Sequence, residues 1–178
     1  MKLTNTPERY GAIAQLFHWI VVVLIITQFW LALTAEGQPL AQKASTLILH
    51  KSIGMTVFAL AVLRLAWRLV NPVPPVPATA PRWQQLGAHA SHIALYSLIL
   101  ITPLLGWLMS SARGFTVSWF HLITLPDLVQ KNEASYKLLV TSHEVAAWTL
   151  FGVAVLHVAA ALKHHFFDRD NVLRRMLP

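Results

Sequence analysis

The sequence predicts an all-α membrane protein, a bundle of four transmembrane helices. Of its 178 residues, 56% are hydrophobic and only 12% are charged, whereas soluble domains carry about 25% charged residues. Four apolar runs approach the length of about 20 residues that crosses the hydrocarbon core. Because lipid offers the backbone no hydrogen-bond partners, unbroken runs of this length form helices. We expect a single integral-membrane domain over residues 1–178.

The predicted helices cover residues 11–33, 47–69, 88–109 and 142–163. The first apolar run is too long to be the core of a cleaved signal peptide. Five of the ten prolines lie in the connection of residues 71–81, which predicts an extended, polyproline-like strap. Pro103 and Gly106 are expected to bend the third helix. The connection of residues 110–141 is the one place with room for additional structure.

The basic residues predict how the bundle lies in the membrane. The net charge of +7 and the isoelectric point near 10.3 do not indicate nucleic acid, because the basic side chains flank the apolar runs. The side that carries both termini has the excess, so the positive-inside rule predicts cytoplasmic termini. That side holds nine basic residues, Lys2, Arg9, Arg64, Arg68, Arg82, Lys163, Arg169, Arg174 and Arg175, and the other holds five, Lys43, Lys51, Arg113, Lys131 and Lys137.

The chemistry of the chain has to rest on histidine. There is no cysteine, which excludes disulfides, thiolate-ligated zinc or iron–sulfur centres, and covalent haem attachment. The chain has nine histidines, and an ionisable side chain at membrane depth is a functional candidate because its burial is costly.

Four histidines fall at membrane depth and form two levels. His143 and His157 are fourteen residues apart on the fourth predicted helix. This spacing is close to a whole number of turns, so both rings point from one face, and the helical rise separates their backbones by about 21 Å. By depth, His18 of the first helix is level with His157, and His50 of the second is level with His143. Each level therefore holds two imidazoles from different helices.

Two imidazoles at one level match the ligation of a haem iron from both faces of the porphyrin. The sequence predicts a bundle that encloses two haems, the inner one ligated by His18 and His157 and the outer one by His50 and His143. With both axial positions filled by protein, oxygen binding at the iron is disfavoured and outer-sphere electron transfer is expected.

Other uses of these histidines are less well supported by the residues. Interhelical hydrogen bonding accounts for a single membrane histidine but less well for four that pair by depth. A proton relay calls for intramembrane carboxylates, and only Glu144 lies close to a span. A zinc site usually needs three or four ligands at one level, whereas each level here has two of this set.

Five further residues near the inner surface are candidates for cofactor contacts. Arg64 and Arg68 lie four residues apart on one helical face, where they suit haem propionates or lipid phosphates. His89 and His92 begin the third helix, and either propionate contact or interfacial snorkelling fits them. His164 follows the fourth helix, where contact with lipid headgroups and proton exchange with a quinone are both open.

These residues together resemble the bacterial cytochrome b561 family of the inner membrane. The resemblance covers nearly the whole chain. It is carried by His18-Trp19, by LHKSIG (Leu49–Gly54), by His143-Glu144 with His157 fourteen residues later, by KHHFFDRDNVLRRM (Lys163–Met176) and by the opening NTPERYG (Asn5–Gly11).

The resemblance implies two haem b groups, the same two histidine pairs, and electron exchange with the quinone pool. One member of the family is a superoxide oxidase, which passes an electron from periplasmic superoxide to ubiquinone. By that analogy this chain would be a superoxide:ubiquinone oxidoreductase with ubiquinone as an exchangeable substrate near His164. The outer basic residues Lys51, Arg113 and Lys137 would then steer the superoxide anion toward the outer haem.

Two other functions stay open from the sequence. The chain would otherwise be a haem-bearing membrane-anchor subunit that relays electrons between quinone and a periplasmic partner enzyme. The third hypothesis is a structural four-helix protein with interfacial histidines and no redox role. Haem content and purification as a stoichiometric complex distinguish these functions from quinone-linked turnover by the chain alone.

Overall fold

Four long helices dominate the structure, a computed structural model that describes residues 2–75 and 80–177. They are α1 (Ala12–Ala35), α2 (Leu40–Val70), α3 (Arg82–Arg113) and α4 (Glu133–Lys163), and α4 continues into a π-helical turn, η1 (His164–Asp168). All four are long and apolar enough to cross a membrane. The predicted four-helix membrane bundle is therefore confirmed.

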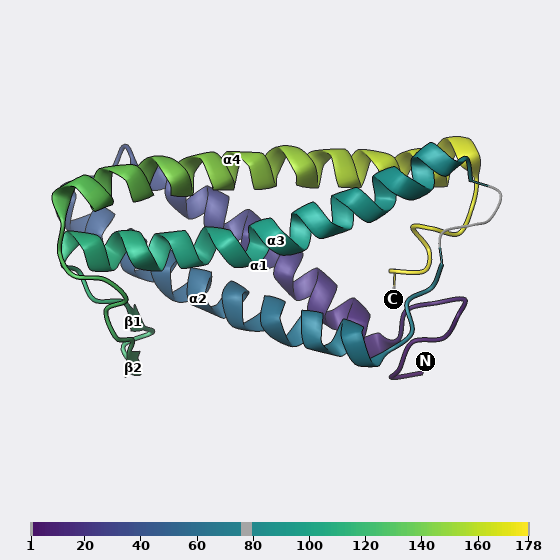
Figure 1. The fold of residues 1–178 in the computed structure, drawn as a ribbon, viewed down its shortest axis with the longest axis horizontal. Helices are drawn as coiled ribbons and strands as arrows, with labels where there is room; N and C mark the ends of the chain where they lie inside the picture. The colour runs from purple at the N-terminus through teal and green to yellow at the C-terminus, as the bar shows by residue number, and fades with distance from the viewer. Residues whose placement is uncertain (1, 76–79, 178) are drawn as a thin grey trace.

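The helices run lengthwise and place the two termini at the same end of the molecule (Figure 1). Helix α1 packs on α2, α2 on α3, and α3 on α4. The backbones of α1 and α4 stay apart over the described residues, and the ring of Phe29 spans the gap to Trp148 and Phe151, with ring centres 6.0 and 5.4 Å away. We call the end with the termini the terminal end and the opposite end the hairpin end.

The helices extend beyond the apolar runs that predict them. Helix α2 begins at Leu40 rather than near residue 47, α3 at Arg82 rather than near 88, and α4 at Glu133 rather than near 142. Proline precedes α2 and α3, and the Asn132 side chain caps α4 by accepting from the Ser135 N–H at 2.9 Å. Hydropathy marks only the lipid-spanning part of a helix, whereas caps set where it begins. Of the proline-rich connection 71–81, residues 76–79 lie outside the described part.

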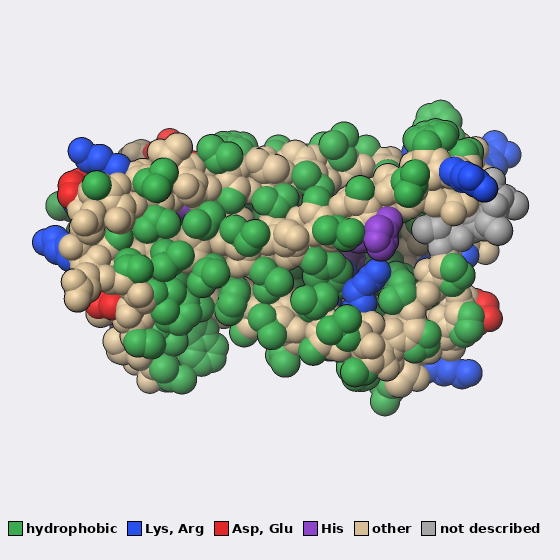
Figure 2. Space-filling view, viewed as in Figure 1, with side chains coloured by type: hydrophobic (Ala, Val, Ile, Leu, Met, Phe, Trp, Pro, Cys, Tyr) green, Lys and Arg blue, Asp and Glu red, His purple; other side chains and the backbone are tan. Residues whose placement is uncertain are grey.

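Most large apolar side chains face outward, as lipid requires. Green hydrophobic side chains cover the middle of the face in Figure 2, and charged side chains lie mostly toward its two ends. Inside, a small apolar cluster draws on every helix: Val21, Val57, Ala61, Ile99 and Leu150. This cluster separates the polar side chains at the two ends of the bundle.

A short hairpin closes one end of the bundle against α2. Strands β1 (Ser118–Trp119) and β2 (Ile123–Thr124) pair antiparallel, with Ser118 opposite Thr124. The hydroxyl of Ser52, a residue only 1% exposed, donates to the Ser118 carbonyl at 3.2 Å and accepts from the Phe120 N–H at 3.0 Å. Trp119 Nε1 donates to Thr56 Oγ1 at 3.0 Å. The hairpin is therefore fixed to the turn of α2 that follows His50.

The C-terminal residues close the opposite end by binding the start of α1. Gln15, 2% exposed, donates from Nε2 toward the carbonyls of Tyr10, Arg175 and Leu177 at 3.2, 3.3 and 2.9 Å. Trp19 Nε1 donates to the Met176 carbonyl at 3.0 Å. Side chains of α1 thus hold residues 175–177 at this end of the bundle by hydrogen bonds.

Gln15→Leu is expected to release this closure. Leucine keeps the size of the side chain but leaves the facing carbonyls unsatisfied, which costs about 1–3 kcal/mol for a buried polar group. Thermal unfolding in detergent should begin at lower temperature, and carboxypeptidase should shorten the chain faster. Gln42→Leu, at an exposed position of α2, is the matched control. Equal proteolysis of both variants would show that Gln15 does not hold the C-terminal residues.

Candidate functional site

His50 and His143 face each other across the bundle at the hairpin end. His50 comes from α2 and His143 from α4, two helices whose backbones do not approach closely anywhere in residues 2–75 and 80–177. Their ring centres are 6.4 Å apart and their planes lie at 78°. The two imidazoles therefore occupy a space that the backbone leaves open.

The Thr102 carbonyl fixes the tautomer of His143. His143 Nδ1 lies 2.9 Å from the Thr102 oxygen. Because a carbonyl only accepts, Nδ1 carries the proton and Nε2 keeps its lone pair. This is the arrangement in which histidine ligates a metal, with the second ring nitrogen held by a backbone carbonyl.

A glycine on α3 lets the His143 ring approach that carbonyl. A Cβ added at Gly106 would lie 3.1 Å from His143 Cε1 and 3.3 Å from Nδ1. The sequence predicts that Pro103 and Gly106 bend α3, and the structure adds that Gly106 is the surface that His143 contacts. No sequence signal predicts the Thr102 contact, because it joins residues forty-one positions apart.

His50 is held differently from its neighbour. Its backbone carbonyl accepts from Gln28 Nε2 at 2.8 Å, while its ring atom Nδ1 is buried without a hydrogen-bond partner among the described residues. A buried polar atom without a partner costs about 1–3 kcal/mol. Among the described residues, nothing therefore satisfies this buried ring nitrogen of His50.

The terminal end gathers His18, His92, His157 and Arg64 from the four helices. The nearest ring to His157 is His92, with ring centres 5.4 Å apart. His18 Nδ1 lies 3.0 Å from a guanidinium nitrogen of Arg64. The structure thus places His92 beside His157, whereas the sequence placed His92 only as a propionate contact or an interfacial residue.

Two arginines flank a small pocket beside these rings. Arg64 and Arg68 both stack on the Tyr96 ring, at 5.4 and 5.6 Å from its centre. The pocket has a volume of about 230 Å³, and it is lined by Leu65, Arg68, His89, His92, Ile93, Tyr96 and Ser97. His89 and Arg68 therefore line one cavity, whereas His164 lies farther along, in η1.

Comparison with known proteins identifies the family. A family model described as prokaryotic cytochrome b561 matches residues 9–178. The chain belongs to this family. Cytochrome b561 homolog 2 of Escherichia coli K12 is 36% identical, over 99% of this chain and 95% of its own length. The probable superoxide oxidase CybB of Yersinia pestis is 31% identical over 96% and 97%, and cytochrome b561 homolog 1 of E. coli K12 is 29% identical over 96% and 98%.

Membership in the cytochrome b561 family confirms the resemblance seen in the sequence. The chain is a multi-pass bacterial membrane protein of electron transfer, and its family implies a b-type haem. The histidines inside the membrane-spanning helices are the residues that could hold this haem.

The residues at the hairpin end fit a cytochrome b561 haem. Two metal–nitrogen bonds of about 2 Å, extended on each side to the ring centre, add up to roughly 6 Å, close to the 6.4 Å between His50 and His143. His143 already has the ligating tautomer, and His50 has a buried ring nitrogen, Nδ1, without a hydrogen-bond partner among the described residues.

The residues at the terminal end also suit a haem, provided that His18 exchanges its contact with Arg64 for one with the iron. The Arg64 guanidinium only donates, so His18 Nδ1 accepts and the proton of the neutral ring lies on Nε2. Ligation through Nε2 would need the lone pair on that atom, so the ring proton would move to Nδ1 and Arg64 would have to leave Nδ1. Arg64 and Arg68, both on Tyr96, supply the positive charge that carboxylates of a cofactor would meet.

Gly106→Ala is expected to weaken haem retention at the hairpin end. The new methyl group would push the His143 ring away from the Thr102 carbonyl, and loss of such an outer contact costs about 10–100-fold in metal affinity. Haem per chain, measured by pyridine haemochrome after extensive washing, should fall. Gly152→Ala is the control, because nothing lies within 4 Å of the added Cβ on that residue of α4. Unchanged haem in the Gly106 variant would exclude this role.

Proposed function

We propose that this cytochrome b561 carries electrons across the membrane between two b haems and exchanges them with ubiquinone. The observation that carries the proposal is the presence of two histidine clusters at opposite ends of the bundle, separated by an apolar layer. His50 and His143 would hold one haem, and His18 and His157 the other. A bound haem supplies one-electron chemistry, since its iron changes oxidation state by one.

The protein side chains position and surround that chemistry. Thr102 holds His143 for ligation through Nε2, and the bundle keeps water from the apolar layer between the two levels. On the terminal side, Arg64 and Arg68 would pair with haem propionates, and His89 and His92 would line the same site. These basic side chains would hold the carboxylates of a haem at the terminal end.

The charge distribution supports an orientation for electron flow. The terminal end carries the excess of basic residues, which favours the cytoplasm under the positive-inside rule. The hairpin end would then face the periplasm and meet the donor. Superoxide is the donor that we favour, because a relative with 31% identity is called a probable superoxide oxidase. Each superoxide would give one electron and leave as oxygen, and two such electrons with two protons reduce one ubiquinone.

His157→Ala tests the two-level arrangement directly. Purified wild type should contain two b haems per chain, and the variant about one, because a single axial histidine retains haem poorly. His121→Ala, in the exposed turn of the hairpin, should keep both. Pyridine haemochrome content and the reduced optical spectrum measure this. One haem in wild type would reject the two-level model, and absence of haem would reject electron transfer altogether.

Lys51 is the basic residue at the hairpin end with the best position to attract an anion. Its Nζ binds the Ser110 hydroxyl at 2.7 Å and lies 5.5 Å from the centre of the Phe115 ring. In the described part of the chain no carboxylate pairs with it, whereas Arg113 is paired with Glu133 at 2.7 Å. The uncompensated charge next to His50 is thus that of Lys51.

Lys51→Met should slow haem reduction by superoxide about threefold at low ionic strength, because steering of an anion follows the local field. The difference should vanish toward 1 M salt, where the Debye length is about 3 Å. Stopped-flow mixing with potassium superoxide measures the rate, and Arg113→Met serves as the control. If haem reduction slows equally in the Arg113 variant, or if salt does not change the wild-type rate, the charge of Lys51 does not attract the donor.

A further inference from the structure

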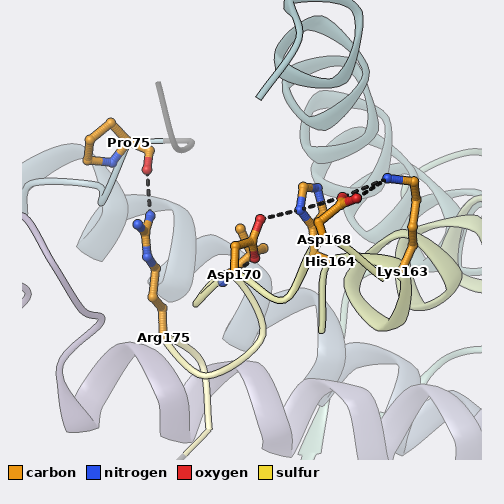
Figure 3. Close-up of polar contacts among 7 residues, drawn as sticks. Pro75, Lys163, His164, Asp168, Asp170 and Arg175 are labelled. Carbon is orange, nitrogen blue, oxygen red and sulfur yellow. Dashed lines mark hydrogen bonds and ion pairs between the residues drawn. The ribbon is translucent and has the colours of Figure 1, made fainter. Parts of the chain in front are cut away.

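A π-helical turn at the end of α4 folds two aspartates back onto a histidine. His164 Nδ1 lies 2.6 Å from Asp170 Oδ2 and 3.4 Å from Asp168 Oδ2 (Figure 3). The His164 side chain is 12% exposed and that of Asp170 22%. This is a partly enclosed histidine–carboxylate pair at the membrane surface, and the haem chemistry above does not use it.

The backbone fixes Asp170 in this position. Arg169 adopts a left-handed conformation with φ 54°, which reverses the chain, and its N–H donates to the His164 carbonyl. The Asp170 N–H donates to the same carbonyl at 3.1 Å. Asp170 Oδ1 accepts from the Val172 N–H at 2.9 Å, the bond of an Asx turn. With Oδ1 occupied, Oδ2 is held against the imidazole.

The second aspartate is neutralised by another partner. Lys163 Nζ binds both oxygens of Asp168, at 2.8 and 2.6 Å, as Figure 3 shows. A divalent cation at His164, Asp168 and Asp170 would have to displace this ammonium group. Asp170 is left as the carboxylate that acts on His164.

We propose that Asp170 is a positioning residue for proton transfer to quinone by His164. The inference rests on the proposed function, with the quinone near His164 as the family resemblance implies. A carboxylate only accepts, so Asp170 keeps a proton on Nδ1 and directs the exchangeable site to Nε2. Among the residues that the structure describes, Nε2 has no hydrogen-bond partner, so it is available to a ligand.

The pair completes the chemistry that haem alone does not provide. Reduction of a quinone to a quinol takes two electrons and two protons. The electrons come from the reduced haems one at a time, one proton comes from Nε2 of protonated His164, and the second comes from water. His164 then regains its proton from the aqueous phase.

Asp170→Asn tests the assignment without changing the shape of the side chain. The amide oxygen can still accept from the Val172 N–H, which turns the NH₂ group toward His164. Because NH₂ donates, Nδ1 must then accept and the ring proton moves to Nε2. Asp168→Asn is the matched control, since it removes the same charge from the same cluster but leaves the Asp170 contact in place.

The first measurement follows oxidation of the fully reduced holoprotein by decylubiquinone in a stopped-flow instrument. Because a positioned acid or base contributes about 10²–10⁴-fold, we expect the Asp170→Asn rate at saturating quinone to fall at least about tenfold. The half-saturating quinone concentration should change less than about twofold. Oxidation by ferricyanide, which takes an electron without a proton, should be unchanged, and Asp168→Asn should resemble wild type on both acceptors.

Three results would overturn the assignment. The first is an Asp170→Asn variant that quinone oxidises at the wild-type rate. The second is an equal loss of rate in Asp168→Asn, which would indicate that the charge and not the tautomer of His164 matters. The third is an equal loss of rate when ferricyanide is the acceptor. Failure of the wild-type haems to react with quinone would instead reject the quinone link of the proposed function.

A second measurement tests whether Asp170 sets the tautomer of His164, even if the haems do not react with quinone. The ¹⁵N spectrum of histidine-labelled, reduced protein, assigned with a His164→Gln variant, should show the Nδ1–H tautomer in wild type and the Nε2–H tautomer in Asp170→Asn. An Nε2–H tautomer in wild type would show that Asp170 does not position this ring.

Discussion

The hydrocarbon interior offers no hydrogen-bond partner, so each polar ring inside this bundle must be satisfied by protein or by a bound group. His143 meets a backbone carbonyl and His18 meets Arg64, whereas Nδ1 of His50 is buried without a partner in the described part of the chain. Those contacts require helices that approach closely at some points and stay apart at others. The spacing of α2 and α4, with two imidazoles between them, follows from this requirement.

The two ends of the bundle are closed by different means. At the hairpin end, Ser52 and Thr56 of α2 hold the loop that follows α3. At the terminal end, Gln15 and Trp19 of α1 hold the last residues of the chain. In both cases polar side chains of a helix bind a segment without regular helix.

The arrangement separates electron chemistry from proton chemistry along one helix. His143 and His157 lie within the membrane part of α4, in the clusters that suit b-type haem. His164 and Asp170 lie just beyond its end, where protons are available from water. In the proposed function, a membrane cytochrome that reduces quinone needs both kinds of site close together, and the end of α4 provides them in sequence.

The apolar runs and the histidine spacing by themselves determined much of this protein. Lipid imposes a minimum length on each helix, so hydropathy identified all four spans, and helical periodicity put His143 and His157 on one face. The family was also recognisable from its motifs. The helix beginnings were less accurate, because the caps at Pro39 and Asn132 lie outside the apolar runs and hydropathy does not register them.

Only the tertiary structure decided which side chains meet. The contact of His92 with His157, that of Thr102 with His143, and the clearance at Gly106 depend on how separate helices are rotated and how closely they pack. Asp170 meets His164 because a π-helical turn and a left-handed residue reverse the chain within six residues. Periodicity describes one helix at a time, and these contacts are made between helices or where a helix ends.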